Sequence, residues 1–335
     1  MLLRRILTRL LTTLVTLLGV SVVVFVVIRV VPGNPIAMML PPGATQADID
    51  RLNALYGFDR SIAEQYVIWL GGVLQGDFGT SIQARQPVLR LVLNRLPATL
   101  ELSIMALVIA VVLGGFLALT GTRLRGSRGE GAIDVTNGMA LSVPDFLWGL
   151  VLILVFGVLW PVFHISGRVS PQYIQEFTTN FFLFESVLRL RLDLWLDLVS
   201  HMLMPALALA IPLAAIIGQL LKQSLKETMH LDYVTLARTK GYRENHVILR
   251  EALPNAVLPT LTLIGVQFTF LIGGTVIIER LFSYEGLGNM AIDAVINRDL
   301  PLIQGIVILF AVLFTAINLI VDLLYAVLNP RLRHA

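Results

Sequence analysis

The amino-acid sequence predicts an all-α, polytopic membrane protein with six transmembrane helices. Hydrophobic residues make up 56% of the chain and charged residues only 14%, whereas soluble domains carry about 25% charged residues. The mean hydropathy is +0.81. The apolar residues gather into six stretches, each close to the roughly 20 residues that a helix needs to cross a bilayer.

The first stretch spans about residues 10–31 and follows Arg4, Arg5 and Arg9. A secretory signal peptide has an apolar region of about 7 to 15 residues and a small-residue cleavage site. This stretch is longer and ends in Val-Pro-Gly-Asn-Pro. We therefore interpret residues 1–31 as a short N-terminus and an uncleaved first span.

Residues 97–335 are predicted to hold the other five spans. The second begins at Pro97, because a proline is well tolerated in the first turn of a helix. The third is expected to bend around Pro144, which cannot donate a backbone hydrogen bond. The predicted limits are about 97–120, 133–160, 202–221, 257–278 and 302–328.

The loops between the spans carry an orientation signal. Arginine and lysine are concentrated in the N-terminus, in residues 123–128, in residues 222–250 and in the C-terminal tail. Six spans place these four segments on one side, and basic loops of membrane proteins face the cytoplasm. Both termini are therefore predicted to be cytoplasmic.

Two segments on the opposite side, residues 32–96 and 162–200, are too long to be simple turns. In the first, Thr45 with Asp48 and Ser61 with Glu64 have the spacing of a capping box ahead of amphipathic runs. These pairs predict two short helices outside the membrane, one ending near Gly57 and the other near Gly76.

A polar loop, residues 222–256, separates the fourth and fifth spans. Val234, Ala237 and Gly241 fall on one face of a short helix, and basic side chains surround that face. A basic helix with small residues favours docking to another protein, although the same pattern suits an amphipathic helix lying on the bilayer.

The polar loop resembles the EAA loop of bacterial ABC-transporter permeases, with Ala237, Gly241, Leu253 and Pro254 at matching positions. Thr235 and Leu236 stand where that pattern has Glu and Ala. Further segments are similar to signatures of the dipeptide and oligopeptide permease family, and they occur in the family's order. They are Val31–Pro35, Gly76–Ser81, Pro97–Leu102, Ser166–Ser170, Phe282–Gly288 and Asn329–Arg331.

The resemblance implies the transmembrane permease subunit of a peptide importer in the bacterial inner membrane. Such a subunit forms the translocation path with a homologous second permease. It works with two cytoplasmic ATPase subunits, which use ATP and Mg, and with an external substrate-binding protein. The sequence itself has no G-x-x-x-x-G-K-[ST] run with which to bind ATP, so we expect no cofactor, metal or catalytic residue in this chain. The basic residues are scattered between the spans and do not indicate nucleic-acid binding. Membrane lipid is expected to surround the spans.

Three groups of residues are the candidates for function. The resemblance assigns Val234, Ala237, Arg238, Gly241, Leu253 and Pro254 to ATPase coupling, although an ordinary helix end would also explain Gly241. Gln267 and Gln219 are candidates for the translocation path, because polar residues within spans are functional candidates; helix–helix contact explains them equally well. Arg168 and Arg189 are candidates for contact with the binding protein, or are merely solvated.

Other polar residues are weaker candidates. Glu101, Asn318 and Asp322 also lie within spans, and a structural pairing is the expected role for Asp322. The five histidines show no metal-binding spacing in the sequence, and there is no cysteine.

Alternative functions stay open at this point. A related importer for nickel, glutathione or a peptide-like antibiotic would share every motif named above. A secondary transporter should show internal repeats and central acidic residues, and an intramembrane enzyme should show a motif such as H-E-x-x-H. Neither pattern occurs in the sequence.

Overall fold

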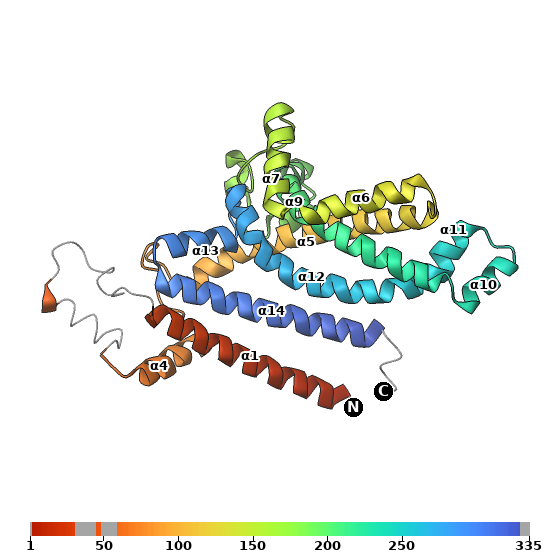
Figure 1. Cartoon of the computed structure of the whole chain (residues 1–335). Helices are drawn as coiled ribbons and strands as arrows, with labels where there is room; N and C mark the ends of the chain where they lie inside the picture. Colours follow the sequence, from red (N-terminus) through yellow and green to blue (C-terminus); the bar gives the residue numbers. More distant parts are fainter. Residues whose placement is uncertain (1, 31–44, 48–58, 329–335) are drawn as a thin grey trace. The chain divides into compact units, whose positions relative to one another are not determined.

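The computed structural model describes residues 2–30, 45–47 and 59–328 (Figure 1). Three predictions fall wholly or largely outside these residues: the Val31–Pro35 motif, the helix ending near Gly57, and the Asn329–Arg331 motif. The side chain of Asp322 also lies outside the described part.

The described residues are helical, with no β-strand among them. The long helices are α1 (Leu2–Val30), α5 (Val88–Arg123), α9 (Leu192–Thr228), α12 (Leu253–Leu281) and α14 (Leu300–Leu328). The short α-helices are α4 (Ile62–Leu74), α6 (Arg128–Ser142), α7 (Asp145–Leu152), α8 (Phe182–Leu188), α10 (Asp232–Thr239), α11 (Glu244–His246) and α13 (Leu287–Ile296). Two π-helical stretches, η1 (Ile153–Leu159) and η3 (Val247–Ala252), and one 3-10 helix, η2 (Pro171–Glu176), are the other named helices of the described residues.

The apolar segments agree with a multi-pass membrane fold. Within the residues that the structure describes, four helical stretches are long and apolar enough to cross a bilayer: Val88–Arg123, Leu192–Thr228, Glu244–Leu281 and Leu300–Val321. The pair formed by α6 and α7–η1 would be a fifth if it crosses as one span. The apolar part of α1 within the described residues, Leu11–Val27, is shorter. With α1 included, six apolar segments overlap the predicted spans. The prediction that Pro97 begins the second span is wrong, because α5 begins at Val88 and contains Pro97 in its interior. The helix of the fourth span, α9, likewise begins at Leu192, inside the segment predicted to lie outside the membrane.

The bend predicted at Pro144 is confirmed and is larger than a kink. The axes of Arg128–Ser142 and Asp145–Leu159 differ by 102°. Val143 has an extended backbone, with φ −103° and ψ 124°, as expected for a residue that precedes proline. The third predicted span is therefore two helices that meet almost at a right angle.

The chain divides into two compact units. Unit 1 comprises residues 1–96 and 290–316, and unit 2 comprises residues 97–289 and 317–335. In unit 1, Phe25 of α1 packs against Tyr66 and Trp69 of α4. The Ser61–Glu64 capping box that begins α4 is confirmed, and Gly76 follows the helix with φ +85°.

Unit 2 contains the larger apolar core, in which α5, α9 and α12 supply most of the buried side chains. A close approach joins α5 to α9. A Cβ atom on Gly114 would lie 2.6 Å from the carbonyl oxygen of Ala214, and one on Gly218 would lie 3.2 Å from that of Gly114. Small residues at such a crossing let two membrane helices come into backbone contact.

The polar loop leads into the fifth span without a break. Residues 244–281 form one continuous helical stretch, so the helix begins earlier than the predicted residue 257. Pro254 lies in the first turn of α12, and its ring would clash with a regular preceding helical turn. The π-helix η3, directly before it, is the kind of local widening that accommodates such a conflict.

Candidate functional site

The loop that contains α10 is held to unit 2 by its apolar face. Val234 is fully buried and Ala237 is 4% exposed. Both belong to an apolar cluster shared with α9, η3 and α12, which includes Leu225, Met229, Val247, Ile248, Ala252 and Ala256. The small and apolar face therefore positions α10 and does not lie on the surface. A role of Val234 and Ala237 in coupling stays a prediction, and it would act through the placement of the helix.

The opposite face of this loop is open. The exposed fractions of Tyr233, Leu236 and Tyr242 are 38%, 54% and 48%. Gly241 follows α10 with φ +82°, and a Cβ atom added there would meet nothing within 4 Å. The backbone conformation, not crowding, therefore favours glycine within this chain. Figure 1 shows α10 and α11 together beyond the ends of α9 and α12.

Arg238 fastens the turn between α10 and α11. Its guanidinium donates to Glu244 at 2.8 Å and to the carbonyl oxygen of Met229 at 3.3 Å. The hydrogen bond to Glu244 raises the pKa of Arg238 above its usual value, against a smaller effect of burial. Arg238 thus gives the loop a fixed shape, and its part in coupling stays a prediction.

Leu253 and Pro254 lie inside the continuous helical stretch, where Pro254 enters the first turn of α12. The next residue, Asn255, donates to the hydroxyl of Tyr233 at 2.9 Å. This bond joins the outward face of α10 to the beginning of α12. A role of Leu253 and Pro254 in coupling stays a prediction.

Gln267 and Gln219 do not come together. Gln267 lines a cavity of about 280 Å³ between α7, α9 and α12, near the Pro144 bend. Gln219 is exposed on α9 and does not line this cavity. Of the two candidates, the geometry thus favours Gln267 for a path within unit 2, and both assignments stay predictions.

Asp145 lines the same cavity and was missed by sequence reasoning. It lies in the first turn of α7, and its carboxylate accepts a hydrogen bond from the backbone N–H of Phe146 at 2.7 Å. Its signal in the sequence was a carboxylate directly after Pro144 in an otherwise apolar stretch.

Arg168 is buried, with 7% of its side chain exposed. Its guanidinium donates to Glu101 of α5 and to the carbonyl oxygen of Asn180, at 2.6 and 2.7 Å. The guanidinium also lies 3.9 Å from the ring centre of Phe182. Any contact of Arg168 with a binding protein remains a prediction, but the structure places its charge in an internal ion pair.

Arg189 lies on the surface beside a carboxylate that organises the same segment. It is paired with Glu185 and donates to the hydroxyl of Thr178. Burial opposes ionisation of Glu185 most strongly. Hydrogen bonds from Thr179 and Thr178 outweigh it and lower the pKa of Glu185 to about 2.

Two of the sequence motifs meet at Glu279. This fully buried carboxylate accepts a hydrogen bond from the hydroxyl of Thr99 at 2.7 Å and from the backbone N–H of Asn289 at 3.0 Å. Thr99 in turn accepts from the backbone N–H of Leu287 at 2.8 Å. A Cβ atom on Gly286 would overlap the Glu279 carboxylate. Glu279 thus closes the turn formed by Phe282–Gly288 onto α5.

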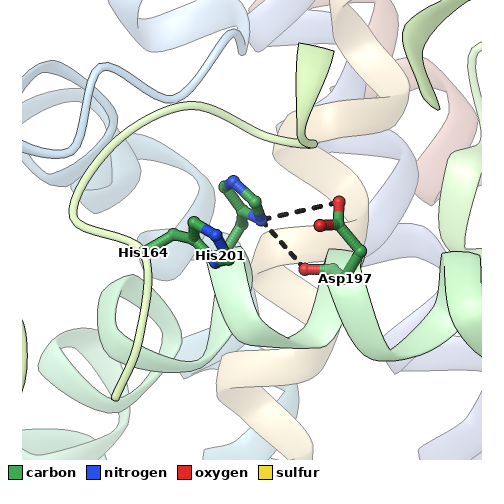
Figure 2. Close-up of side chains that lie close together, drawn as sticks. All are labelled: His164, Asp197 and His201. Atoms are coloured by element: carbon green, nitrogen blue, oxygen red, sulfur yellow. Dashed lines mark hydrogen bonds and ion pairs between the residues drawn. The ribbon is translucent and has the colours of Figure 1, made fainter. Parts of the chain in front are cut away.

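Figure 2 shows a histidine pair that the sequence did not indicate. The rings of His164 and His201 are stacked, with centroids 4.0 Å apart, and Asp197 lies beside them. His201 donates through Nδ1 to the carbonyl oxygen of Asp197, which fixes its tautomer. The three residues offer ligand atoms within 4.8 Å of one another, but Nδ1 of His164 bonds the hydroxyl of Ser200 and Nδ1 of His201 bonds the carbonyl oxygen of Asp197. The observed role of Asp197 is to accept hydrogen bonds from the backbone and hydroxyl of Ser170, which fastens the Ser166–Ser170 segment to α9.

Comparison with known proteins gives two family matches. Residues 83–334 match the family described as "Binding-protein-dependent transport system inner membrane component". Residues 2–103 match the corresponding N-terminal family of these membrane components.

Curated relatives cover nearly the whole chain. A di/tripeptide transport system permease protein of Pseudomonas aeruginosa is 35% identical, and a dipeptide transport system permease protein of Escherichia coli is 37% identical. An oligopeptide transport system permease protein of Bacillus subtilis is 32% identical. In each case the alignment covers 92% of both chains. With a multi-pass helical fold, the predicted motifs in order and matches over almost its full length, this chain belongs to the family of binding-protein-dependent transport system inner membrane components.

Proposed function

We propose that this chain is a permease subunit of an ATP-driven importer of dipeptides or short oligopeptides. The observation that carries the proposal is the open, glycine-ended α10 loop, which is fixed to α9 and α12 through a buried apolar cluster and a hydrogen bond from Asn255 to Tyr233 at the surface. Such a loop can bind a partner subunit and transmit its conformational change to the membrane spans. The peptide substrate class is inferred from the names of the relatives, which are di/tripeptide, dipeptide and oligopeptide transport permeases.

The proposed assembly contains a second, homologous permease, two cytoplasmic ATPase subunits and an external substrate-binding protein. ATP and Mg would be used by the ATPase subunits and not by this chain. The proposed location is the bacterial inner membrane, with both termini and α10 on the cytoplasmic side, in line with the basic loops.

Impermeant thiol labelling tests this orientation in the cysteine-free chain. A cysteine at the exposed Gln86 should react in intact cells, whereas one at Asn245 should react only after permeabilisation. Ser81 is unsuitable as a reporter, because it is 1% exposed and bonded to Asp299. Labelling of Asn245 from outside would contradict the orientation.

Gly241→Glu tests the coupling role. The substitution adds a charge and bulk to the open face, so we expect ATPase subunits to be lost from the purified complex, with loss of ATP-driven peptide uptake into proteoliposomes. The loss of ATPase subunits and uptake should be smaller in Gly241→Ala. Alanine adds no charge and little bulk, and it disturbs the turn only because a positive φ costs it about 1–2 kcal/mol.

Gly167→Glu is the matched control. Gly167 also has a positive φ, +84°, and open space around its Cβ position, but it lies in the segment proposed to face outside. ATPase subunits should stay bound in this variant. Normal uptake by Gly241→Glu, or equal loss of ATPase subunits from both variants, would refute the coupling role.

A further inference from the structure

A cavity of about 420 Å³ lies within unit 2 beside the α10 loop. It is bounded by the end of α5, the turn into α6, the end of α9 and the α10–α11 turn. Figure 1 shows these elements at the same end of unit 2. The cavity is lined by five cations, Arg123, Arg125, Lys222, Lys226 and Arg238, and by two carboxylates, Glu130 and Glu244.

The carboxylates neutralise only part of this charge. Lys222 is paired with Glu130 at 2.9 Å and with Asp134 at 2.7 Å, and Arg238 is paired with Glu244 at 2.8 Å. Arg123, Arg125 and Lys226 form no ion pair or hydrogen bond with any residue that the structure describes. Arg125 lies close enough to Glu130 to help lower the pKa of that carboxyl, but the same carboxylate is already paired with Lys222. The three cations therefore face a shared space without an ion pair of their own.

The location of the cavity distinguishes between kinds of anion. The apolar spans Val88–Arg123 and Leu192–Thr228 both end beside it, so it lies at the level of a membrane surface. Leu124, between two of the arginines, is 44% exposed. A general excess of cations on cytoplasmic loops explains why basic residues are present. It does not explain why three unpaired cations from two separate segments converge on one cavity.

We propose that this cavity binds the phosphodiester headgroup of an anionic phospholipid. Arg123, Arg125 and Lys226 would contact the phosphate, and an acyl chain would lie against Leu124 and the end of α5. Basic pockets at the cytoplasmic ends of membrane helices bind such headgroups. Because Arg238 and Glu244 line the same cavity, the bound lipid would also fix the shape of the α10 loop. The inference rests on the orientation given in the proposed function.

The test is direct binding to the full-length chain, purified in a neutral detergent without partner subunits. Fluorescent phosphatidylglycerol is titrated, and phosphatidylcholine with the same fluorophore is the reference. We expect saturable binding of phosphatidylglycerol only. One cation near an anionic lipid contributes about fivefold in affinity. The double variant Arg125→Gln/Lys226→Gln should therefore raise the apparent Kd about 25-fold.

The matched control is Arg243→Gln/Arg250→Gln. These arginines are exposed in the same loop but do not line the cavity, so the Kd should change by less than about twofold. The variant Arg125→Lys/Lys226→Arg keeps both charges and should bind nearly as the parent chain does. Melting curves in neutral detergent check that each variant is folded.

Three results would overturn the inference. The first is equal weakening in both charge-removing double variants, because that indicates bulk charge only. The second is equal binding of the two lipids. The third is saturable binding of inorganic phosphate that Arg125→Gln/Lys226→Gln abolishes, without a preference for phosphatidylglycerol, because the ligand would then be a soluble anion. Failure of ATP-driven peptide uptake with this lipid preference intact would refute the proposed function alone.

Discussion

The buried pair of Arg168 and Glu101 makes a quantitative prediction about the outer segment of unit 2. Arg168→Met removes an ion pair at 2.6 Å and the hydrogen bond to the carbonyl oxygen of Asn180. The Glu101 carboxylate is then left buried, with backbone N–H groups such as that of Leu183, at 2.8 Å, as its remaining partners. Removing one member of a buried pair costs about 3–5 kcal/mol, mostly because the other charge is stranded.

Removing both charges should cost less than the sum of the single changes. Glu101→Gln keeps an acceptor for the N–H of Leu183, and in the double variant no charge is stranded. We expect a coupling energy of about 2–3 kcal/mol between the two positions, in the range measured for residues in one network. The free energy of unfolding of Arg168→Lys should lie between those of the parent chain and Arg168→Met. Lysine keeps the positive charge but lacks the planar guanidinium with its several fixed donors.

The measurement is denaturant unfolding of the full chain in neutral detergent, followed by tryptophan fluorescence, with protease cleavage within residues 162–200 as a local readout. The matched control is the exposed pair of Arg191 and Asp193, which has the same 2.6 Å separation but is 43% and 46% exposed. The coupling energy between Arg191 and Asp193, measured by the same double-variant cycle, should be less than about 1 kcal/mol. Equal and additive losses at the two pairs would show that burial does not set the strength of the Arg168–Glu101 contact.

Three further predictions concern packing and pH. Gly114→Ala should destabilise unit 2 by about 1–3 kcal/mol by forcing α5 from α9, whereas Gly115→Ala, with nothing within 4 Å of its Cβ position, should be tolerated; equal melting temperatures would refute the close crossing. Gly286→Ala should loosen the turn at Glu279, measured by protease cleavage after α12, while Gly273→Ala, in open space, should not; identical cleavage would contradict the contact. Because the pKa of Glu185 is lowered to about 2 from 4.5, its stabilising contribution is complete above about pH 5 and is lost as the pH falls toward 2. Protease resistance of residues 171–190 should fall in that window in the parent chain but not in Glu185→Gln, and a parallel fall in both would exclude Glu185 as the cause.

Local patterns in the sequence predicted the features that depend on local rules. The apolar stretches, the Ser61–Glu64 capping box, the end of a helix near Gly76 and the bend at Pro144 follow from residue type and spacing alone. The size of that bend did not follow, because Pro144 removes a hydrogen bond without fixing how far the two helices separate.

Contacts between segments that are distant in the sequence could not be predicted from such local rules. Arg168 could be read as an exposed charge, because its partner Glu101 lies 67 residues away. The burial of Val234 could not be predicted for the same reason, because whether this face of α10 packs on α9 depends on tertiary packing. His164 and His201 show no metal spacing in the sequence, yet the fold stacks their rings.

The Glu279 contact has a consequence for how the protein is made. Thr99 and Leu287 are separated by 188 positions in the chain, so the pocket around this carboxylate cannot close until synthesis has passed Asn289. Until then Thr99 lacks the backbone N–H of Leu287, and Glu279 near the end of α12 lacks that of Asn289, so the acid is only partly satisfied, at a cost that hydrocarbon surroundings increase. The earlier helices of unit 2 can therefore insert one by one, but their final packing waits for the turn at Phe282–Gly288. We expect this turn to be a late closing step in biogenesis, because it completes the hydrogen bonds of the Glu279 carboxylate.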